Sequence, residues 1–477
     1  MTYYIDIGLE VHAQLKTTTK MFSDGPTLFG QAPNTQVAPV DMGMPGTLPI
    51  INAAAIKQAI MFGLSCGASI NHYCEFARKS YFYPDLPKGY QISQFNYPVV
   101  QDGIIHYLNG KESGHVRIQR AHLEEDAAKS MHNTLAAKSY IDLNRSGQPL
   151  LEIVTHPDIH SASSAIAYLK TLHNLVRYLG ICDGNMQEGS FRCDVNISLR
   201  ANTEQPLGRR VEVKNLNSFK FIEKAIEHEY TRQSKLIDQQ QPVQQETRLF
   251  DEVSGTTKPL RSKEEAPDYR YFPDPDLPVL MITEEDINAV RETMPELPWD
   301  KQRRYQDQHQ LSEYDAKILS HDIDVARFFD QVASQTQLEV KQIANWIIVE
   351  LLALTNKHQV SFREIPISQD AFTELMDLIH SQVINGKIAK SLLSDMWQTQ
   401  QQPSLLVEER GLAQITDPDQ INQLILNVMQ QSDKQITAYR SGKVQLFGYF
   451  VGQVMKASQG KANPALTNQL IKQYLDN

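Results

Sequence analysis

The strongest constraint on the fold is a strict alternation of apolar and polar residues between Phe191 and Arg200. A period of two over such a length predicts a strand with one face on a hydrophobic core. After a polar loop, residues 210–214 alternate in the same sense, which predicts an antiparallel partner strand. The polar face of this pair carries Arg192, Asp194, Asn196, Glu212 and Lys214.

Three further stretches have equally dense polar faces, which argues against the ordinary interpretation of a solvated sheet face. Residues 3–15 alternate again and place Glu10 and His12 side by side on one face. Residues 115–126 begin as a strand and run into an acidic cluster, and residues 140–154 predict two strands around a turn. These two stretches add the acidic residues Glu124, Glu125 and Glu152.

The whole chain predicts an α+β fold in several domains, because 477 residues exceed what one hydrophobic core usually organises. Strand-like alternation stops near residue 295, and helical periodicity replaces it. We expect an N-terminal domain with an antiparallel sheet at 1–294, an all-α helical domain at 295–405 and a small α-helical tail domain at 406–477. Within the first domain, helices are expected at 52–64, 161–179 and 218–240, the last with Asn217 as its N-cap.

Composition excludes several classes of protein. No apolar run is long enough to span a membrane, and the N-terminal segment does not resemble a secretion signal. The four cysteines form no CxxC pair, which favours a reducing cytoplasm and argues against a disulfide framework or a thiolate zinc site. The net charge of −10 argues against a general nucleic-acid binder.

The C-terminal segment has the opposite charge. From residue 434 to residue 472 there is no acidic residue, although the chain as a whole is acidic. This asymmetry indicates a local contact with nucleic acid, and the alternative is a basic helical surface without such a role. The candidate contacts are Lys434, Arg440, Lys443, Lys456 and Lys461.

The residues themselves favour a phosphotransfer site. Carboxylates with one imidazole suit Mg²⁺, and interleaved Arg and Lys suit the phosphates of ATP. No glycine-rich phosphate loop is present. The proline-interrupted segment 78–94 predicts a loop that either rims a pocket or packs on the surface, and both alternatives stay open.

Seven segments, in order along nearly the whole chain, are distinctive: SYFYPDLPKGYQISQ (80–94), AHLEEDA (121–127), LLEIVTHPDI (150–159), GSFRCDVNISLR (189–200), EVKNLNSF (212–219), DYRYFPDPDLP (268–278) and GYFVGQVMKASQGKANP (448–464). They resemble hallmark stretches of the B subunits (GatB) of the bacterial glutamyl/aspartyl-tRNA amidotransferases. Several exceed ten residues, so a chance match is excluded in practice.

The resemblance implies a cradle like the sheet of glutamine synthetase and guanidino kinases, followed by helical domains that contact tRNA. It also implies a cytoplasmic ligase that uses ATP and Mg²⁺ to phosphorylate the side-chain carboxylate of Glu-tRNA(Gln) or Asp-tRNA(Asn). Ammonia channelled from a partner amidase then displaces the phosphate, and the heterotrimer also contains a small third subunit.

The resemblance further assigns roles to residues. His12, Glu10 and Glu125 are expected as metal ligands and catalytic groups, with Glu124 and Glu152 as further ligands; Glu125 is the expected proton relay for ammonium. The ATP-binding set is Arg192, Asp194, Asn196, Glu212 and Lys214. The approach of ammonia or phosphate is assigned to Lys79, Tyr81, Tyr83 and Lys88.

The chain departs from the family pattern at two places. Many relatives carry CxC and CxxC pairs in the first forty residues or so, where this chain has Ser23, Gly25, Ala38 and Asp41, so we expect no structural zinc. His156 stands where the family pattern has Glu, and we leave it out of the ligand set. Two alternatives remain open at this point: a stand-alone ligase or kinase for a small substrate, and a non-catalytic tRNA-binding scaffold.

Overall fold

The computed structural model describes residues 3–133, 138–262, 268–415 and 417–476. It divides into two compact units, Met1–Leu297 and Pro298–Asn477. The predicted α+β fold is confirmed, because a large sheet occupies the first unit and helices form the second. The finer domain bounds at 294/295 and 405/406 stay a prediction.

The first unit is built on a sheet of nine strands in its described part. In spatial order these are β14 (Thr256–Ser262), β13 (Glu246–Asp251), β12 (Val211–Lys214), β11 (Phe191–Arg200), β1 (Tyr4–Gln14), β10 (Pro149–Thr155), β7 (Glu112–Glu125), β6 (Val100–Asn109) and β2 (Ser69–Ile70).

The predicted antiparallel pairing of β11 with β12 is confirmed, with Asn196 opposite Glu212. One pair in the sheet, β12 with β13, is parallel. The reason is that helix α3 (Phe219–Asp238) connects these two strands and returns the chain in the same direction. The strands on either side of the turn at 145–148 do not pair with each other. β10 joins the large sheet, whereas β9 (Lys138–Asp142) pairs with β8 (Lys129–Asn133).

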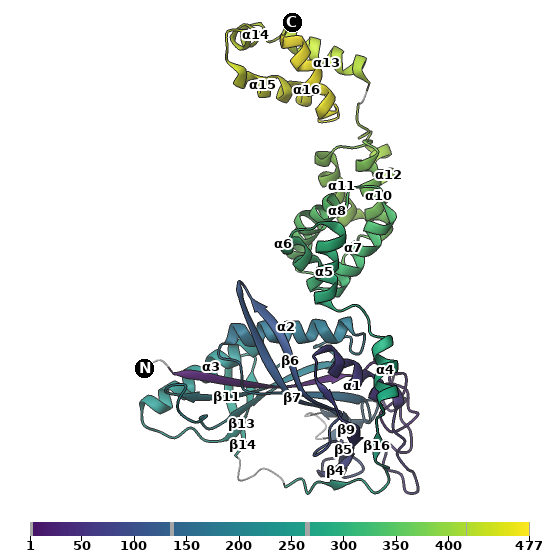
Figure 1. Ribbon diagram of the computed structural model, residues 1–477, viewed down its shortest axis with the longest axis vertical. Helices are drawn as coiled ribbons and strands as arrows, with labels where there is room; N and C mark the ends of the chain where they lie inside the picture. The colour runs from purple at the N-terminus through teal and green to yellow at the C-terminus, as the bar shows by residue number, and fades with distance from the viewer. Residues whose placement is uncertain (1–2, 134–137, 263–267, 416, 477) are drawn as a thin grey trace. The chain divides into compact units, whose positions relative to one another are not determined.

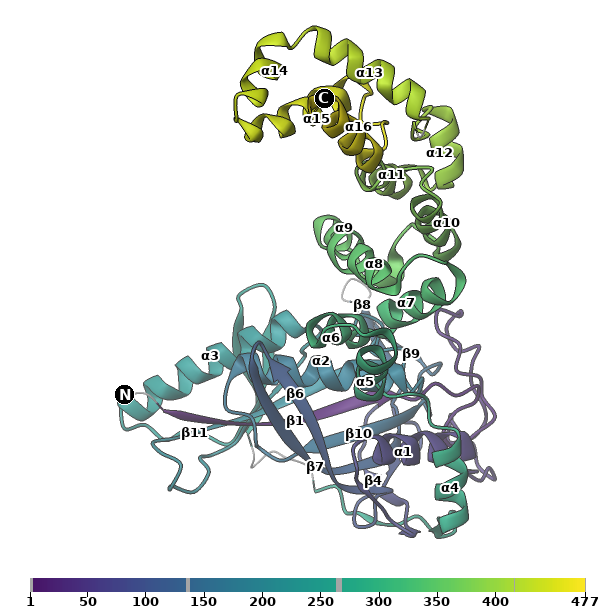
Figure 2. The same ribbon diagram turned by 45° about the horizontal axis from the view of Figure 1, so that its top comes forward.

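Helices α1 (Ala53–Ser65), α2 (Ala162–Tyr178) and α3 cover one face of the sheet, as Figures 1 and 2 show from two angles. The inward residues of the central strands lie in this core, where Leu9, Val11, Ile153 and Val195 are fully buried. The opposite face is left to the polar residues. The N-cap of helix α3 is Ser218, whose side chain accepts a hydrogen bond from the backbone N of Phe221, so the prediction of Asn217 as its N-cap was wrong.

Segment 78–94 was predicted as a loop, but it contains β4 (Ala77–Ser80) and β5 (Tyr90–Ser93), which pair antiparallel. A distant strand, β15 (Phe272–Pro273), extends this small sheet by pairing with β4. The first unit also contains β3 (Tyr73–Cys74), β16 (Leu280–Met281) and helix α4 (Glu284–Glu292). The proline-broken segment after residue 268 therefore folds back onto the first unit.

The second unit is helical and has two hydrophobic cores. The first core is shared by α5 (Pro298–His309), α6 (Glu313–His321), α7 (Ile323–Gln335), α8 (Val340–Asn345), α9 (Leu352–His358), α10 (Gln369–His380), α11 (Gly386–Thr399) and α12 (Pro403–Glu409). A π-helical turn, Trp346–Leu351, lies between α8 and α9.

The second core is shared by α13 (Pro418–Gln430), α14 (Asp433–Arg440), α15 (Phe447–Ala457) and α16 (Pro464–Asp476), which are labelled in Figure 2. None of the helices in the described ranges combines the length and the apolar character that a membrane crossing requires.

Candidate active site

The register of the central strands brings the polar side chains of the sheet into rows. His12 on β1 stands opposite Glu152 on β10, and Glu152 stands opposite His122 on β7. On the other side of β1, Glu10 stands opposite Asp194 of β11. Because neighbouring strands are about 4.8 Å apart, side chains in one row can reach a common ligand.

These rows form the floor of a cavity of about 540 Å³ on the polar face of the sheet. Its lining includes the predicted residues Glu10, His12, Lys79, Glu124, Glu152, Glu212 and Lys214. It also includes residues that were not predicted, among them Gln94, Arg120, His122, Arg210, Thr247, Tyr269 and Tyr271.

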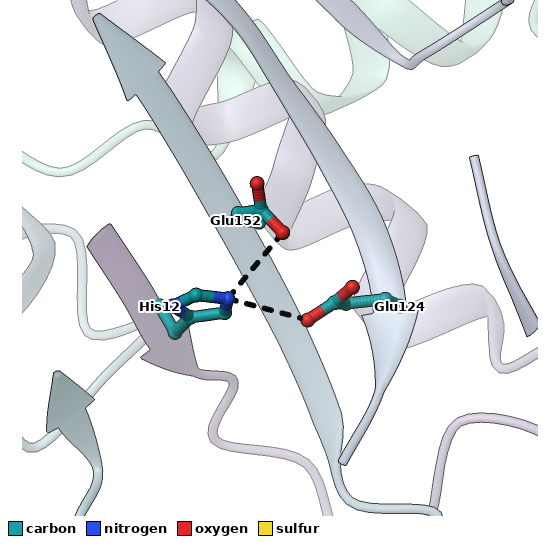
Figure 3. A group of neighbouring side chains, drawn as sticks. All are labelled: His12, Glu124 and Glu152. Carbon is teal, nitrogen blue, oxygen red and sulfur yellow. Dashed lines mark ion pairs between the residues drawn. The ribbon is translucent and has the colours of Figure 1, made fainter. Parts of the chain in front are cut away.

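The first acidic group is His12, Glu124 and Glu152, from three adjacent strands (Figure 3). The Nε2 atom of His12 lies 3.3 Å from Oε2 of Glu152 and 3.6 Å from Oε1 of Glu124. One ligand atom from each residue lies within 4.8 Å of the others. Two carboxylates and one imidazole at this spacing form a donor set for a hard divalent cation.

The charges of this group are strongly perturbed. Burial and the nearby carboxylate of Glu152 raise the pKa of Glu124. Burial opposes the charge on His12, but the hydrogen bond and charge of Glu152 outweigh it and raise the pKa of His12 to about 9. Crowded acids at the bottom of a cavity are typical of functional sites, since folding alone does not favour them.

The second acidic group is Glu10, Asp194 and Glu212, whose ligand atoms also lie within 4.8 Å of one another. Asn196 donates a hydrogen bond of 2.8 Å to Glu10. Lys214 pairs with Asp194 at 2.5 Å and with Glu212 at 2.9 Å. Burial opposes the charge on Lys214, but these two acids outweigh it and raise the pKa of Lys214. Four of the five residues assigned to ATP therefore lie in one group with Glu10.

Comparison with known proteins identifies the family. The GatB/GatE catalytic domain matches residues 5–288, and the GatB domain matches residues 327–475. The chain belongs to the GatB/GatE family.

Three relatives illustrate the similarity, and each is named as the B subunit of an aspartyl/glutamyl-tRNA(Asn/Gln) amidotransferase. The protein from Coxiella burnetii is 49% identical over 473 residues, which cover 98% of this chain and 99% of the relative. Those from Nitrosococcus oceani and Alkalilimnicola ehrlichii are each 48% identical over 471 residues, or 98% of both chains.

In this GatB/GatE member the consecutive acids Glu124 and Glu125 point to different places. Glu125 accepts hydrogen bonds from Lys88 Nζ at 2.5 Å and from the backbone N of Ile92 at 3.0 Å. It is absent from both acidic groups in the described structure. The geometry therefore does not favour Glu125 as a metal ligand, because neighbouring residues of a strand face opposite sides.

The other predicted residues are distributed around the cavity. Lys79 lies 4.8 Å from the centre of the Tyr269 ring and lines the cavity. Arg192 pairs with Asp126 at 2.7 Å instead of with the acids of the floor. Tyr81 and Tyr83 stack on each other outside the cavity lining, and His156 is also absent from it.

The sequence contained a signal for part of what was missed. His122 and Glu124 are two apart, so alternation within β7 could have placed His122 beside Glu124. Tyr269 and Tyr271 could not be found in this way, because their position depends on the pairing of β15 with β4.

The basic residues of the C-terminal segment lie on the surface of the second unit. Lys434, Arg440, Lys443 and Lys456 are exposed or half-buried, and so is Lys461. All but Lys443 and Lys461 belong to α14 or α15. This surface suits contact with an anionic partner, and its sign differs from that of the whole chain.

Proposed function

We propose that this chain is the B subunit of a tRNA-dependent amidotransferase, the function that the names of its relatives give. It converts Glu-tRNA(Gln) or Asp-tRNA(Asn) into the amidated product in the cytoplasm, within a heterotrimer whose other members are an amidase and a small third subunit. The observation that carries the proposal is that five of the six residues of the two acidic groups line one cavity, which is also lined by Lys79 and Lys214.

In the first step an oxygen of the substrate's side-chain carboxylate attacks the γ-phosphorus of ATP. The bond from this phosphorus to the β,γ-bridging oxygen breaks, and ADP leaves with the electron pair. The products are ADP and an acyl phosphate. Asn196, Glu212 and Lys214 position the nucleotide, with Asp194 holding Lys214 in place by an ion pair of 2.5 Å; Arg192 extends this set towards Asp126.

The two acidic groups fit Mg²⁺, since carboxylate oxygens dominate both donor sets. His12, Glu124 and Glu152 would hold one ion, and Glu10 with Asp194 and Glu212 would hold a second. Bound Mg²⁺ neutralises phosphate charge and makes the γ-phosphorus more electrophilic. The hydrogen bond from Asn196 fixes the carboxylate of Glu10 in the orientation that such a ligand needs.

In the second step ammonia attacks the carbonyl carbon of the acyl phosphate, and the bond to the phosphate oxygen breaks with its electron pair on the phosphate. The attacking nitrogen loses one proton, which leaves with inorganic phosphate. Glu125 is the proposed acceptor for the extra proton of arriving ammonium. Glu125 pairs with Lys88, and Lys88 lines a second cavity of about 150 Å³. In this proposal ammonia approaches the active site by way of that second cavity, so Glu125 lies on its path. Tyr81 and Tyr83 flank this approach in the loop between β4 and β5.

The relay role has a sharp test in the heterotrimer. Glu125→Gln should keep phosphate release that is stimulated by aminoacyl-tRNA, because acyl phosphate formation does not need this proton transfer. The yield of amidated tRNA per phosphate should fall strongly with glutamine as donor. Equal yields in the variant and the wild type would remove Glu125 from this role.

The basic surface at Lys434, Arg440, Lys443, Lys456 and Lys461 is the proposed tRNA-binding surface of the second unit. Replacing Lys434, Lys443 and Lys456 by Gln should weaken tRNA binding and lower the salt slope by roughly two, at about 0.7 to 0.9 for each phosphate that is no longer neutralised. The matched control replaces three lysines on the helices of the first unit, Lys57, Lys220 and Lys224. An equal effect in both variants would reject a specific role for the basic surface.

The experiment that tests the proposal as a whole is reconstitution of the chain with the amidase and the small third subunit. ATP-dependent phosphate release and amide formation are measured with Glu-tRNA(Gln), Asp-tRNA(Asn) and uncharged tRNA. Release that requires a charged tRNA supports the proposal. A stand-alone kinase would not require tRNA for its activity. If the chain were a scaffold with all chemistry in a partner, release by the complex would survive the removal of a carboxylate from the cavity floor, as in Glu124→Gln.

A further inference from the structure

Of the Lys and Arg side chains that line the cavity, Lys214 has acidic partners, whereas Lys79, Arg120 and Arg210 form no ion pair within the described ranges. Two donors without a hydrogen-bond partner in the described structure, one on Arg120 and one on Gln94, lie near β7. The guanidinium of Arg120 makes no hydrogen bond or ion pair with any residue in the described ranges, and its Nε atom is buried. The side-chain nitrogen of Gln94 is likewise buried without a partner, and Gln94 is only 1% exposed. Both residues line the cavity.

The amide of Gln94 has a fixed orientation. Its oxygen accepts hydrogen bonds from the backbone N of Leu123 at 3.0 Å and of Val99 at 3.3 Å. A flipped amide would set its own donors against these two N–H groups. The NH₂ group therefore has to point away from them, and a buried donor left without a partner costs free energy unless a ligand or water accepts from it.

Arg120 reaches the cavity because of a β-bulge. In β7, Val116 and Ile118 face the core, and simple alternation would place residue 120 in the core as well. The register to β10 shifts here, since Thr155 stands opposite Ile118 but Val154 stands opposite Arg120. The extra residue turns Arg120 to the polar face, and bulges are common beside active sites for this reason.

The sheet order separates these donors from the nucleotide-binding residues. Asn196 and Lys214 lie on β11 and β12, on one side of β1, whereas Arg120 lies on β7, on the other side. In phosphoryl transfer the attacking and leaving oxygens lie roughly in line, on opposite sides of the phosphorus. The attacking carboxylate therefore approaches from the side opposite the nucleotide, and it needs donors that are not already occupied.

We propose that Arg120 and Gln94 bind the side-chain carboxylate of the aminoacyl group on the tRNA. This inference rests on the proposed function. The guanidinium compensates the negative charge before transfer. The neutral amide donor of Gln94 serves the carboxylate and also the uncharged carbonyl of the acyl phosphate that follows.

The test uses the heterotrimer and the variant Arg120→Ala. The value of kcat/KM for the charged tRNA should fall roughly ten- to a hundredfold, the range for losing a charge-assisted hydrogen bond. The KM for ATP and the Kd for uncharged tRNA should stay unchanged. Arg120→Lys should restore part of the loss, because it returns the charge without the planar fork.

The matched control is Arg117→Ala on the same strand, where an exposed Arg pairs with Asp158 outside the cavity lining. A second variant, Gln94→Glu, keeps an acceptor for Leu123 and Val99 but turns the donor into an acceptor. It should lower kcat/KM for charged tRNA by at least as much. Its melting temperature reports on folding, and Arg120→Ala decides the outcome if this variant is unstable.

The outcomes separate the two proposals. A wild-type complex without ATP-dependent amidation overturns the proposed function itself. An active wild type, with kcat/KM for charged tRNA unchanged in Arg120→Ala, overturns only the role of Arg120 and Gln94. An increase confined to the KM for ATP would also overturn that role and assign Arg120 to the nucleotide.

Discussion

Two of the groups of buried charge in the first unit are built in opposite ways: a closed group of Lys20 and Asp41, and an open group of His12, Glu124 and Glu152. In the first, one cation meets one anion: Lys20 Nζ lies 3.0 Å from Oδ2 of Asp41, and the side chains are 0% and 3% exposed. Asp41 also accepts hydrogen bonds from Ser23 Oγ and the backbone N of Ala38, both at 2.8 Å. The chain closes tightly over this pair, since a Cβ on Gly147, at a φ of +81°, would lie 2.7 Å from Asp41 Oδ1.

The open group lies on the cavity floor and is built differently. Glu124 and Glu152 lie between two imidazoles, with His12 at 3.6 and 3.3 Å and His122 at 3.9 and 3.4 Å, and a volume of about 540 Å³ stands above them. In the closed group each charge is satisfied by its neighbours, so its removal should affect stability. In the open group burial opposes the charge on Glu152, but His122 and His12 outweigh it and lower the pKa of Glu152, whereas burial and Glu152 raise the pKa of Glu124. Further compensation for a charged Glu124 therefore has to come from what the site binds.

The largest expected effect is that of removing one acid from the open group of His12, Glu124 and Glu152. Glu124→Gln should lower aminoacyl-tRNA-dependent phosphate release on the order of a thousandfold, within the range for losing a positioned catalytic group. The melting temperature should not fall, because burial and Glu152 raise the pKa of Glu124 and the fold therefore disfavours its charge. Phosphate release and thermal melting of the same preparation measure both quantities.

The control for this variant is Glu112→Gln, an exposed acid at the other end of the same strand. It should leave release and melting unchanged. If Glu124→Gln instead lowered the melting temperature by many degrees and kept release, the open group would be structural like that of Lys20 and Asp41.

The contrast between the two groups also shows what sequence could and could not predict. Alternation identified β1, β11 and β12 and the polar faces of Glu10, His12 and Asp194, because a period of two is a local property. It could not show that β10 lies between β1 and β7, and this order is what brings Glu152 to His12. Consecutive acidic residues are usually solvated, yet Glu124, Glu125 and Asp126 are all buried.

Other features depend on local irregularities or distant pairing. The bulge that turns Arg120 to the cavity interrupts the alternation, so the same rule that found His12 would have placed Arg120 in the core. The family resemblance placed Glu125 among the metal ligands with Glu124, although the strand directs its side chain to Lys88. The partner of Lys20 lies 21 residues away in a loop without periodicity, and no pattern in the sequence indicated it.

The next largest effect should come from breaking the buried ion pair of the closed group, Lys20 and Asp41. Asp41→Asn keeps the size of the side chain but leaves the charge of Lys20 buried without a partner. Breaking a buried ion pair in this way costs about 3 to 5 kcal/mol. The apparent melting temperature of the first unit should fall by roughly 5 to 15 °C, while phosphate release per folded molecule stays unchanged. A loss of release without a change in melting would place this pair in the active site.

A smaller effect is expected when both charges are removed together. In the double variant Lys20→Met, Asp41→Asn, no unpaired charge remains, and the methionine fills the space of the lysine stem. Replacing a complete buried pair is often nearly neutral, so the melting temperature should return to within about 2 °C of wild type. The difference between the double variant and the two single variants measures the coupling. A double variant as unstable as Asp41→Asn would show that geometry, and not charge, holds this loop.

The last prediction is that zinc removal has no effect, because we expect the chain to hold no structural zinc. At the positions where many relatives carry cysteines, this chain offers a hydroxyl at Ser23, no side-chain donor at Gly25 or Ala38, and a carboxylate at Asp41 that already binds Lys20. Structural zinc prefers thiolate and imidazole ligands, and a buried ammonium beside the carboxylate would repel a cation. Elemental analysis of the purified chain should therefore find no stoichiometric zinc, and a zinc chelator should not shift the melting temperature in magnesium-free buffer. If the wild-type chain contained stoichiometric zinc and Asp41→Asn lost it, then zinc, and not the ion pair of Lys20 with Asp41, would hold this loop.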